Sequence, residues 1–228
     1  MEYKIIGDAF PVLICQPNVG EKVITQRGGM SWRTAGFEMA TNATGGFMKG
    51  LRRSLAGGSI FQNHYTATEA NQEIAFGLTF PGEIKRFDIT EGNDIIAQKN
   101  AFIACTENVG IDMHFNRKLG AGLFAGEGFI LERFAGDGMV FVEIDGKSHE
   151  YDLAAGEHIL IDCGYLAAME PTVTFDIETV KGVKNVLLGG EGLFLGRLTG
   201  PGKVWLQTLP ITGIQRLIAA STASNSST

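Results

Sequence analysis

A glycine-led segment that occurs three times in the chain constrains its fold more than any other feature. The copies lie at residues 55–65, 124–134 and 188–198, and each has a histidine or arginine just before its last apolar position. A segment that recurs along one chain indicates a repeated structural unit. The alternative is a phosphate loop, but no copy leads directly into the Gly-Lys-Ser/Thr sequence that such a loop requires. We interpret the glycines as turn or bulge positions; they include Gly57, Gly126 and Gly190.

Three further patterns keep the same order around each copy. The first is a glycine-led hairpin, the second a strand of alternating apolar and polar residues, and the third an apolar closing strand. The hairpins begin at residues 20, 92 and 156, and the closing strands at 74, 140 and 204. This order predicts an all-β fold of three sequence-related units with about five short strands each. The units span about 10–80, 82–145 and 147–209.

The three units have to share their packing, because one such unit cannot bury both faces of its sheet alone. We therefore expect β-sandwich or barrel-like modules with internal pseudo-threefold symmetry over residues 1–209. Neither end carries a polar, proline-capped repeat, so outer strands would be left as exposed edges. Closed self-association removes such edges. The sequence thus predicts a homo-oligomer.

Two segments at the end of the chain depart from the β pattern. Residues 210–220 place Ile211, Ile214, Leu217 and Ile218 on one stripe, which predicts a short C-terminal helix. Residues 221–228 form a polar tail with no apolar residue pattern that would pack.

An insertion at residues 44–55 distinguishes the first unit from the other two. Its apolar residues fall at helical spacing and its cations share the other face, which is typical of a segment that lies on an anionic membrane or a partner. The competing interpretation is a loop whose apolar side chains cover one end of the β core. The candidate interaction surface consists of Phe47, Met48, Lys49, Leu51, Arg52 and Arg53.

Acidic and basic residues also recur at matching places in the three units. The simplest interpretation is structural, because opposite charges on neighbouring strands form cross-strand pairs worth about 0.2–1 kcal/mol each. A ligand site repeated three times is the alternative. The acids are Glu38, Asp112 and Asp176, and the basic positions are His64, Arg133 and Arg197.

Composition restricts the partners and the compartment. The net charge is −6 and the pI about 5.3, which argues against a nucleic-acid binder, since such domains are normally basic. Three cysteines without a C-x-x-C pair predict neither a disulfide framework nor a zinc site, and they fit the reducing cytoplasm. We also expect no secretory signal and no membrane-spanning segment, because the chain has no matching apolar run.

No catalytic motif is evident. The four histidines lack the spacing of a cupin metal site, although a site assembled from distant residues stays open. The chain contains no G-x-S-x-G elbow and no S-x-x-K motif. We therefore expect no catalytic residue, no metal and no cofactor, and we expect the cysteines to be buried structural thiols.

Several of these segments together resemble a known family. The insertion with the following Gly57-Gly58-Ser59-Ile60-Phe61, the run 189–193, Thr199-Gly200-Pro201-Gly202 and Trp205-Leu206-Gln207-Thr208 are similar to the altered-inheritance-of-mitochondria, or mitochondrial biogenesis, family. The resemblance covers roughly residues 1–209. That family is similar in fold to the tryptophan RNA-binding attenuation protein (TRAP), a ring of small β-sandwiches. The resemblance thus implies TRAP-like modules and a homotrimer whose units mimic a larger ring, but no enzymatic activity.

These observations lead to one principal functional hypothesis and three alternatives. The principal hypothesis is a non-enzymatic, cytoplasmic, oligomeric β scaffold or binding module. The first alternative is a peripheral membrane or lipid-associated protein that uses the insertion. The second is a small-ligand or RNA binder, by analogy with the TRAP-like ring. The third is an enzyme of the double-stranded β-helix type.

Overall fold

A computed structural model describes residues 1–43, 61–117, 129–179 and 194–211, and Gly213. Most of these residues lie in antiparallel β-strands, which confirms the predicted all-β class. None of the sheets closes into a barrel among the described strands, so they are open sheets. The insertion at 44–55, the tail at 221–228 and most of the predicted helix at 210–220 lie outside the described residues.

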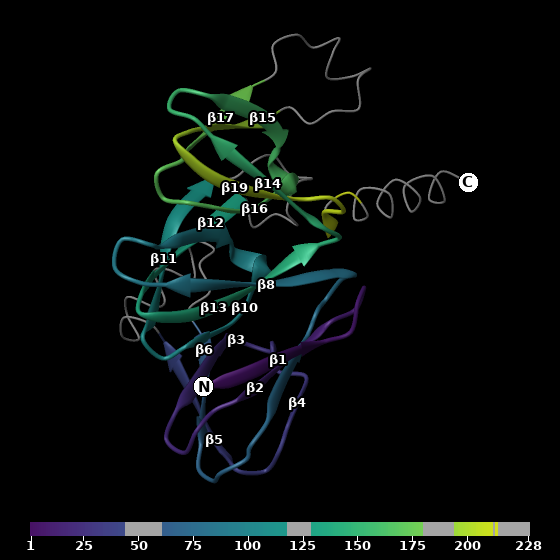
Figure 1. Ribbon diagram of the computed structural model, residues 1–228, viewed down its shortest axis with the longest axis vertical. Helices are drawn as coiled ribbons and strands as arrows, with labels where there is room; N and C mark the ends of the chain where they lie inside the picture. Colours follow the sequence, from purple (N-terminus) through teal and green to yellow (C-terminus); the bar gives the residue numbers. More distant parts are fainter. Residues whose placement is uncertain (44–60, 118–128, 180–193, 212, 214–228) are drawn as a thin grey trace, which may run out of the picture.

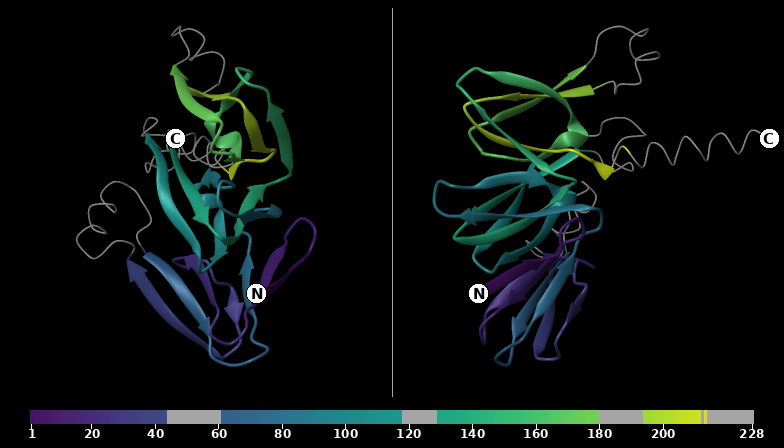
Figure 2. Two further views of the ribbon diagram at one scale, coloured as in Figure 1. Left: turned by 60° about the vertical axis from the view of Figure 1, so that its left-hand side comes forward. Right: turned by 45° about the vertical axis from the view of Figure 1, so that its right-hand side comes forward.

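The strands fall into three successive groups along the chain, stacked along the long axis of the molecule (Figures 1 and 2). The first group contains β1 (Glu2–Ile6), β2 (Val12–Gln16), β3 (Lys22–Gln26), β4 (Trp32–Arg33), β5 (Phe37–Ala43), β6 (Phe61–Ala67) and β7 (Ile74–Gly77). The second contains β8 (Gly82–Ile89), β9 (Ile95–Gln98), β10 (Phe102–Thr106), β11 (Val109–Arg117), β12 (Phe129–Gly136) and β13 (Gly138–Asp145). The third contains β14 (Ser148–Leu153), β15 (His158–Asp162), β16 (Leu166–Met169), β17 (Thr174–Thr179), β18 (Phe194–Thr199) and β19 (Gly202–Gln207).

The same strand order recurs in all three groups. One sheet of each group has the order β2-β7-β4, β8-β13-β10 or β14-β19-β16, and the other has β3-β6-β5, β9-β12-β11 or β15-β18-β17. Adjacent groups share sheets, because β3 pairs with β10 and β9 pairs with β16. We call these two pairings the first and second joints. The result is a four-stranded sheet that includes β1, two six-stranded sheets and a three-stranded sheet.

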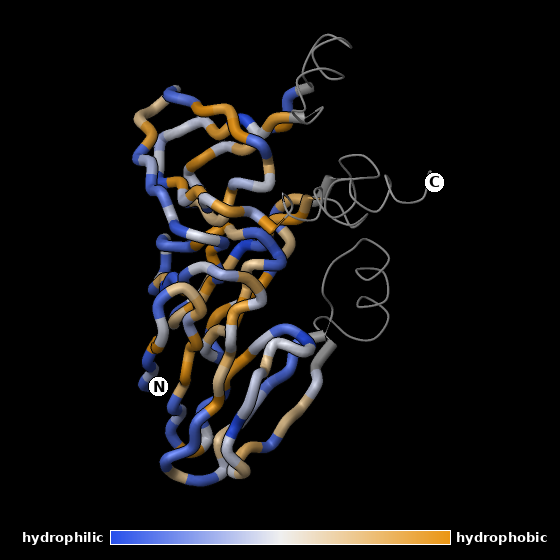
Figure 3. Tube along the Cα trace, turned by 90° about the vertical axis from the view of Figure 1, so that its right-hand side faces the viewer, coloured by the Kyte–Doolittle hydropathy of each residue, from blue (hydrophilic) through white to orange (hydrophobic). Residues whose placement is uncertain are grey.

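Strands next to the joints are buried on both faces. Val140 and Val142 of β13 point into the second group's hydrophobic cluster, whereas Phe141 between them packs in the first group's cluster. Likewise, Trp205 of β19 belongs to the second cluster and its neighbour Val204 to the third. This explains why these strands read as continuous apolar runs, as strands buried on both faces do. Figure 3 shows apolar segments along the strands and hydrophilic ones at the turns.

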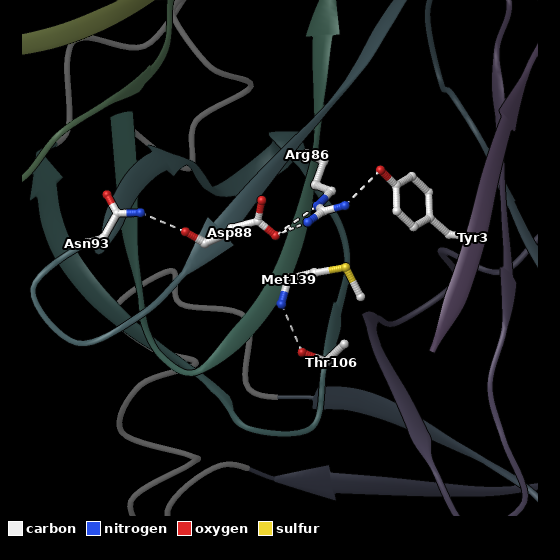
Figure 4. A network of polar contacts seen from close by, with 6 residues as sticks. All are labelled: Tyr3, Arg86, Asp88, Asn93, Thr106 and Met139. Atoms are coloured by element: carbon white, nitrogen blue, oxygen red, sulfur yellow. Dashed lines mark hydrogen bonds and ion pairs between the residues drawn. The ribbon is translucent and has the colours of Figure 1, made fainter.

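Strand β1 contacts strands β13 and β8 of the second group through the Tyr3 side chain. No sequence pattern predicted this strand. The Tyr3 ring meets Phe141 edge-to-face at 4.9 Å between centroids. Arg86 of β8 donates from Nη1 to the Tyr3 hydroxyl at 3.0 Å and from Nε to Asp88 at 2.9 Å (Figure 4). Within the second group, the Met139 backbone N–H on β13 donates to Thr106 Oγ1 on β10 at 3.0 Å. The first and second groups are therefore held together by side chains as well as by strand pairing.

Replacing Phe141 with alanine tests the importance of two-sided burial. The side chain is fully buried, so its removal should lower the free energy of unfolding by about 3–5 kcal/mol. Chemical denaturation measures this loss. The control is Phe10→Ala, since Phe10 is 72% exposed and its loss should cost under about 0.5 kcal/mol. A similar small loss for both variants would contradict the packing argument.

Burial of Glu132 makes stability depend on pH. This side chain lies on β12 opposite Ala97, is 8% exposed, and has its pKa raised to about 7 by burial, although Lys99 acts in the opposite direction. The folded state therefore keeps a proton that the unfolded state releases near its ordinary pKa of 4.5. The contribution of Glu132 to stability is present in full at low pH and is lost as the pH rises through 7.

We expect the free energy of unfolding to fall between pH 5 and pH 8, with up to about 3 kcal/mol of the loss arising at Glu132. Denaturant titrations of the parent chain and of Glu132→Gln across this range isolate that contribution. The variant should show a flatter profile. Identical pH profiles for the two proteins would rule out an ionisation at this site.

Candidate interaction edges

The structure places the recurring charged residues on adjacent strands, and two of the three predicted pairs lie directly opposite each other. Asp112 lies directly opposite Arg133, and Asp176 opposite Arg197. The third predicted pair is displaced along the strands, because Glu38 lies opposite Thr66 rather than His64.

Each of the two arginines forms an ion pair with an acid that lies diagonal to it. Arg133 donates from Nε to Asp94 at 2.8 Å, and Arg197 forms an ion pair with Glu178. Diagonal neighbours on adjacent strands are within reach of long side chains. Nothing in this arrangement brings the three charged sets together into one site. The candidate interaction surface of the insertion lies outside the described residues. The same holds for the three predicted turn or bulge glycines, Gly57, Gly126 and Gly190.

Burial shifts the pKa of the three cysteines and of His64. Burial raises the pKa of the thiols of Cys15 and Cys163 to about 12, and it raises the pKa of Cys105 as well. Burial, together with the charge of Lys22, lowers the pKa of His64. Within the described ranges, no three histidine, cysteine, aspartate or glutamate side chains gather as metal ligands would.

Strands β4 and β15, in the first and third groups, are the counterparts of strands that pair between groups at the joints. β10 and β16, the third strands of the sheet order given above, each pair with a strand of the preceding group, and β4 is their counterpart in the first group. In the same way, β3 and β9 pair with the following group, and β15 is their counterpart in the third. Among the described strands, β4 and β15 each end their sheet. We call these two strands the free edges.

In each of the corresponding strands β4, β10 and β16, one residue forms an alanine–aromatic pair with the neighbouring strand. Ala104 lies opposite Phe141, and Ala168 opposite Trp205. In both cases the pair is buried in the hydrophobic cluster of the preceding group. At the free edge Trp32 lies opposite Ala75, with the aromatic residue on the other strand of the pair. Because no group precedes the first, Trp32 is 51% exposed.

The other free edge exposes an aliphatic residue for the same reason. Ile24 and Ile96 lie at the first and second joints, are 5% and 0% exposed, and pack in the cluster of the following group. Leu160 occupies the matching position on β15 and is 48% exposed.

Sequence reasoning missed these two edge residues as a site. The signal in the sequence was that Trp32 stands where the other two units have alanine, and that Leu160 stands where they have isoleucine.

A comparison with solved structures finds the same fold in another protein. In the described residues, no helix has the length and apolar character needed to cross a membrane. The X-ray structure of protein SPYM3_0169 from Streptococcus pyogenes superposes with a TM-score of 0.78 and 20% identity, over 96% of this chain and 99% of that chain, which shows a shared fold. No protein of the curated collection matches the sequence.

The sequence model of one family, described as Mitochondrial biogenesis AIM24, matches residues 3–209. This match covers most of the 228 residues and includes the strands on both sides of each joint. It agrees with the resemblance inferred from the glycine-rich segments. The chain therefore belongs to the mitochondrial biogenesis AIM24 family.

Proposed function

We propose that this protein is a non-enzymatic, oligomeric β scaffold or binding module, built from three units, whose copies join head to tail through the free edges. The observation that carries the proposal is the pair of internal joints, because β4 and β15 are the counterparts of the strands that already pair in β3–β10 and β9–β16. An edge strand with exposed apolar side chains is a template for pairing with another chain.

The internal joints also supply a register for the proposed interface. Ala104 pairs with Thr25 at the first joint, and Ala168 with Ala97 at the second. Transferred to the free edges, this register sets Trp32 opposite Ile161 of the partner subunit. The next position then sets Arg33 opposite Leu160 of the partner subunit.

Burial of the two exposed edge residues supports association in this register. Fully burying a large aliphatic or aromatic side chain contributes about 1.5–3 kcal/mol. Because Trp32 and Leu160 belong to different ends of one chain, a closed assembly buries both in every copy. A heterologous contact of this kind forms a ring when its rotation closes.

Family membership and the thiols support the remaining parts of the proposal. A trimeric ring with TRAP-like modules is what the family resemblance implies. Cytoplasmic localisation fits three buried cysteines without a disulfide among the described residues. A role in binding rather than catalysis fits thiols whose pKa burial raises far above neutrality.

Substituting glutamate for one edge residue at a time, as Trp32→Glu and Leu160→Glu, tests the assembly. Light scattering after gel filtration should give about three times the 24.5 kDa mass of one chain for the parent protein. Each edge variant should dissociate toward monomer, because burying an unpaired carboxylate opposes association. Circular dichroism should show unchanged β content, because both side chains are about half exposed within one chain.

The matched control is Phe10→Glu, which adds the same charge at an exposed aromatic residue outside both edges. This variant should keep the parent mass. A parent protein that is monomeric at all concentrations, or an oligomer that neither edge variant weakens, would refute head-to-tail pairing.

A further inference from the structure

A polar cavity of about 190 Å³ lies beside the first joint. It is bounded by the turn between β3 and β4, including Arg27, Gly28 and Gly29, and by Thr79 after β7. Phe102 at the start of β10 and Glu143 on β13 also line the cavity.

Glu143 is a buried carboxyl group with one oxygen left for a ligand. The side chain is only 9% exposed. Its Oε1 accepts the backbone N–H groups of Thr79 and Phe80, both at 3.0 Å. Among the described residues, no hydrogen bond to Oε2 is present, and the side chain lines the cavity. Oε2 is therefore available to a hydrogen-bond donor inside the cavity.

The second joint shows what this position requires. Gln207 on β19 is the counterpart of Glu143. Its Oε1 accepts the Asp145 N–H at 3.1 Å, just as Glu143 Oε1 accepts the Thr79 N–H. There, the Gln207 Nε2 donates to the Gly164 carbonyl at 2.8 Å, so the amide is satisfied on both sides. Glutamate offers only acceptors when it is ionised. When Glu143 is ionised, the first joint therefore lacks a donor that the second joint supplies from its own side chain.

We propose that the cavity beside the first joint binds a small primary ammonium ion, held by charge-assisted hydrogen bonds to Glu143. Hydrogen bonds between an ammonium group and a carboxylate are roughly twice as strong as neutral ones. A divalent metal ion fits less well, because the described residues place no three acidic, histidine or cysteine ligands together. An anion is disfavoured because the buried group carries negative charge when ionised.

The charges around the cavity are compatible with a cation at Glu143. Arg27 contributes the single positive charge of the lining, and it is exposed, so water screens it. Asp145, on the same strand, adds negative charge and raises the pKa of Glu143. The lining residues from β7 and β10 and the loop after β7, which are Gly77, Thr79, Phe102 and Ile103, carry no ionisable group.

Binding of the cation should depend on pH, because the proton and the ligand compete for Glu143. Burial is the main cause that raises the pKa of Glu143 to about 7. The ionised fraction of a group with this pKa rises about tenfold from pH 6 to pH 8. We therefore expect the apparent Kd for the ammonium ion to be about tenfold higher at pH 6 than at pH 8.

The experiment titrates methylammonium chloride against the purified full chain and follows the thermal midpoint, with potassium chloride at the same ionic strength as the reference. A ligand that binds only the folded state raises the midpoint, and the stabilisation grows with the logarithm of one plus the ratio of ligand concentration to Kd. At pH 8, methylammonium should raise the midpoint more than potassium does. Glu143→Gln should abolish the difference, and this variant should fold because Gln207 occupies the matching position.

Glu132→Gln is the matched control, because Glu132 is also buried with a raised pKa but does not line the cavity. This variant should keep the methylammonium effect and its pH dependence. An equal midpoint shift with potassium, or an unchanged methylammonium effect in Glu143→Gln, overturns the proposal. The absence of any shift up to 100-millimolar methylammonium also overturns it. None of these outcomes depends on the oligomeric state.

Discussion

The pairing of a strand in one group with a strand in the next is the interaction on which the rest of the structure depends. Each of the two joints turns two short sheets into one six-stranded sheet whose opposite faces serve different cores. Phe141 illustrates the result, because it packs in the first cluster while the valines on both sides of it pack in the second. A group of six or seven short strands gains from this arrangement a second buried face that it could not make alone.

The same constraint explains why the ends of the array differ from its middle. Side chains that the joints would bury are left in solvent where the series stops, as Trp32 and Leu160 show. The internal chemistry of the joints is also not uniform. Gln207 both accepts and donates hydrogen bonds within the chain, whereas Glu143 accepts two and lines a cavity. Joints with the same backbone pairing can therefore differ in what they require from outside the chain.

Local features of the fold could be predicted from the sequence, and long-range ones could not. The all-β class was predictable because alternation and glycine-led turns are local signals. Gly20, Gly92 and Gly156 indeed adopt positive φ values of 87°, 81° and 79° at their hairpins. The joints could not be predicted, because the only local sign of strand pairing between groups is a continuous apolar run in the strand. The charged pairs were predicted on neighbouring strands, but Arg133 and Arg197 reach diagonal acids. Glu143 was missed because its burial depends on the joint.

The distribution of cysteine over the three cores has a practical consequence. Cys15 lies in the first cluster, Cys105 in the second and Cys163 in the third. All three are buried, so a thiol reagent can reach each one only when the surrounding core opens. The chain thus carries one intrinsic reporter per core. The relative labelling rates of these thiols would show whether the cores open one at a time or together.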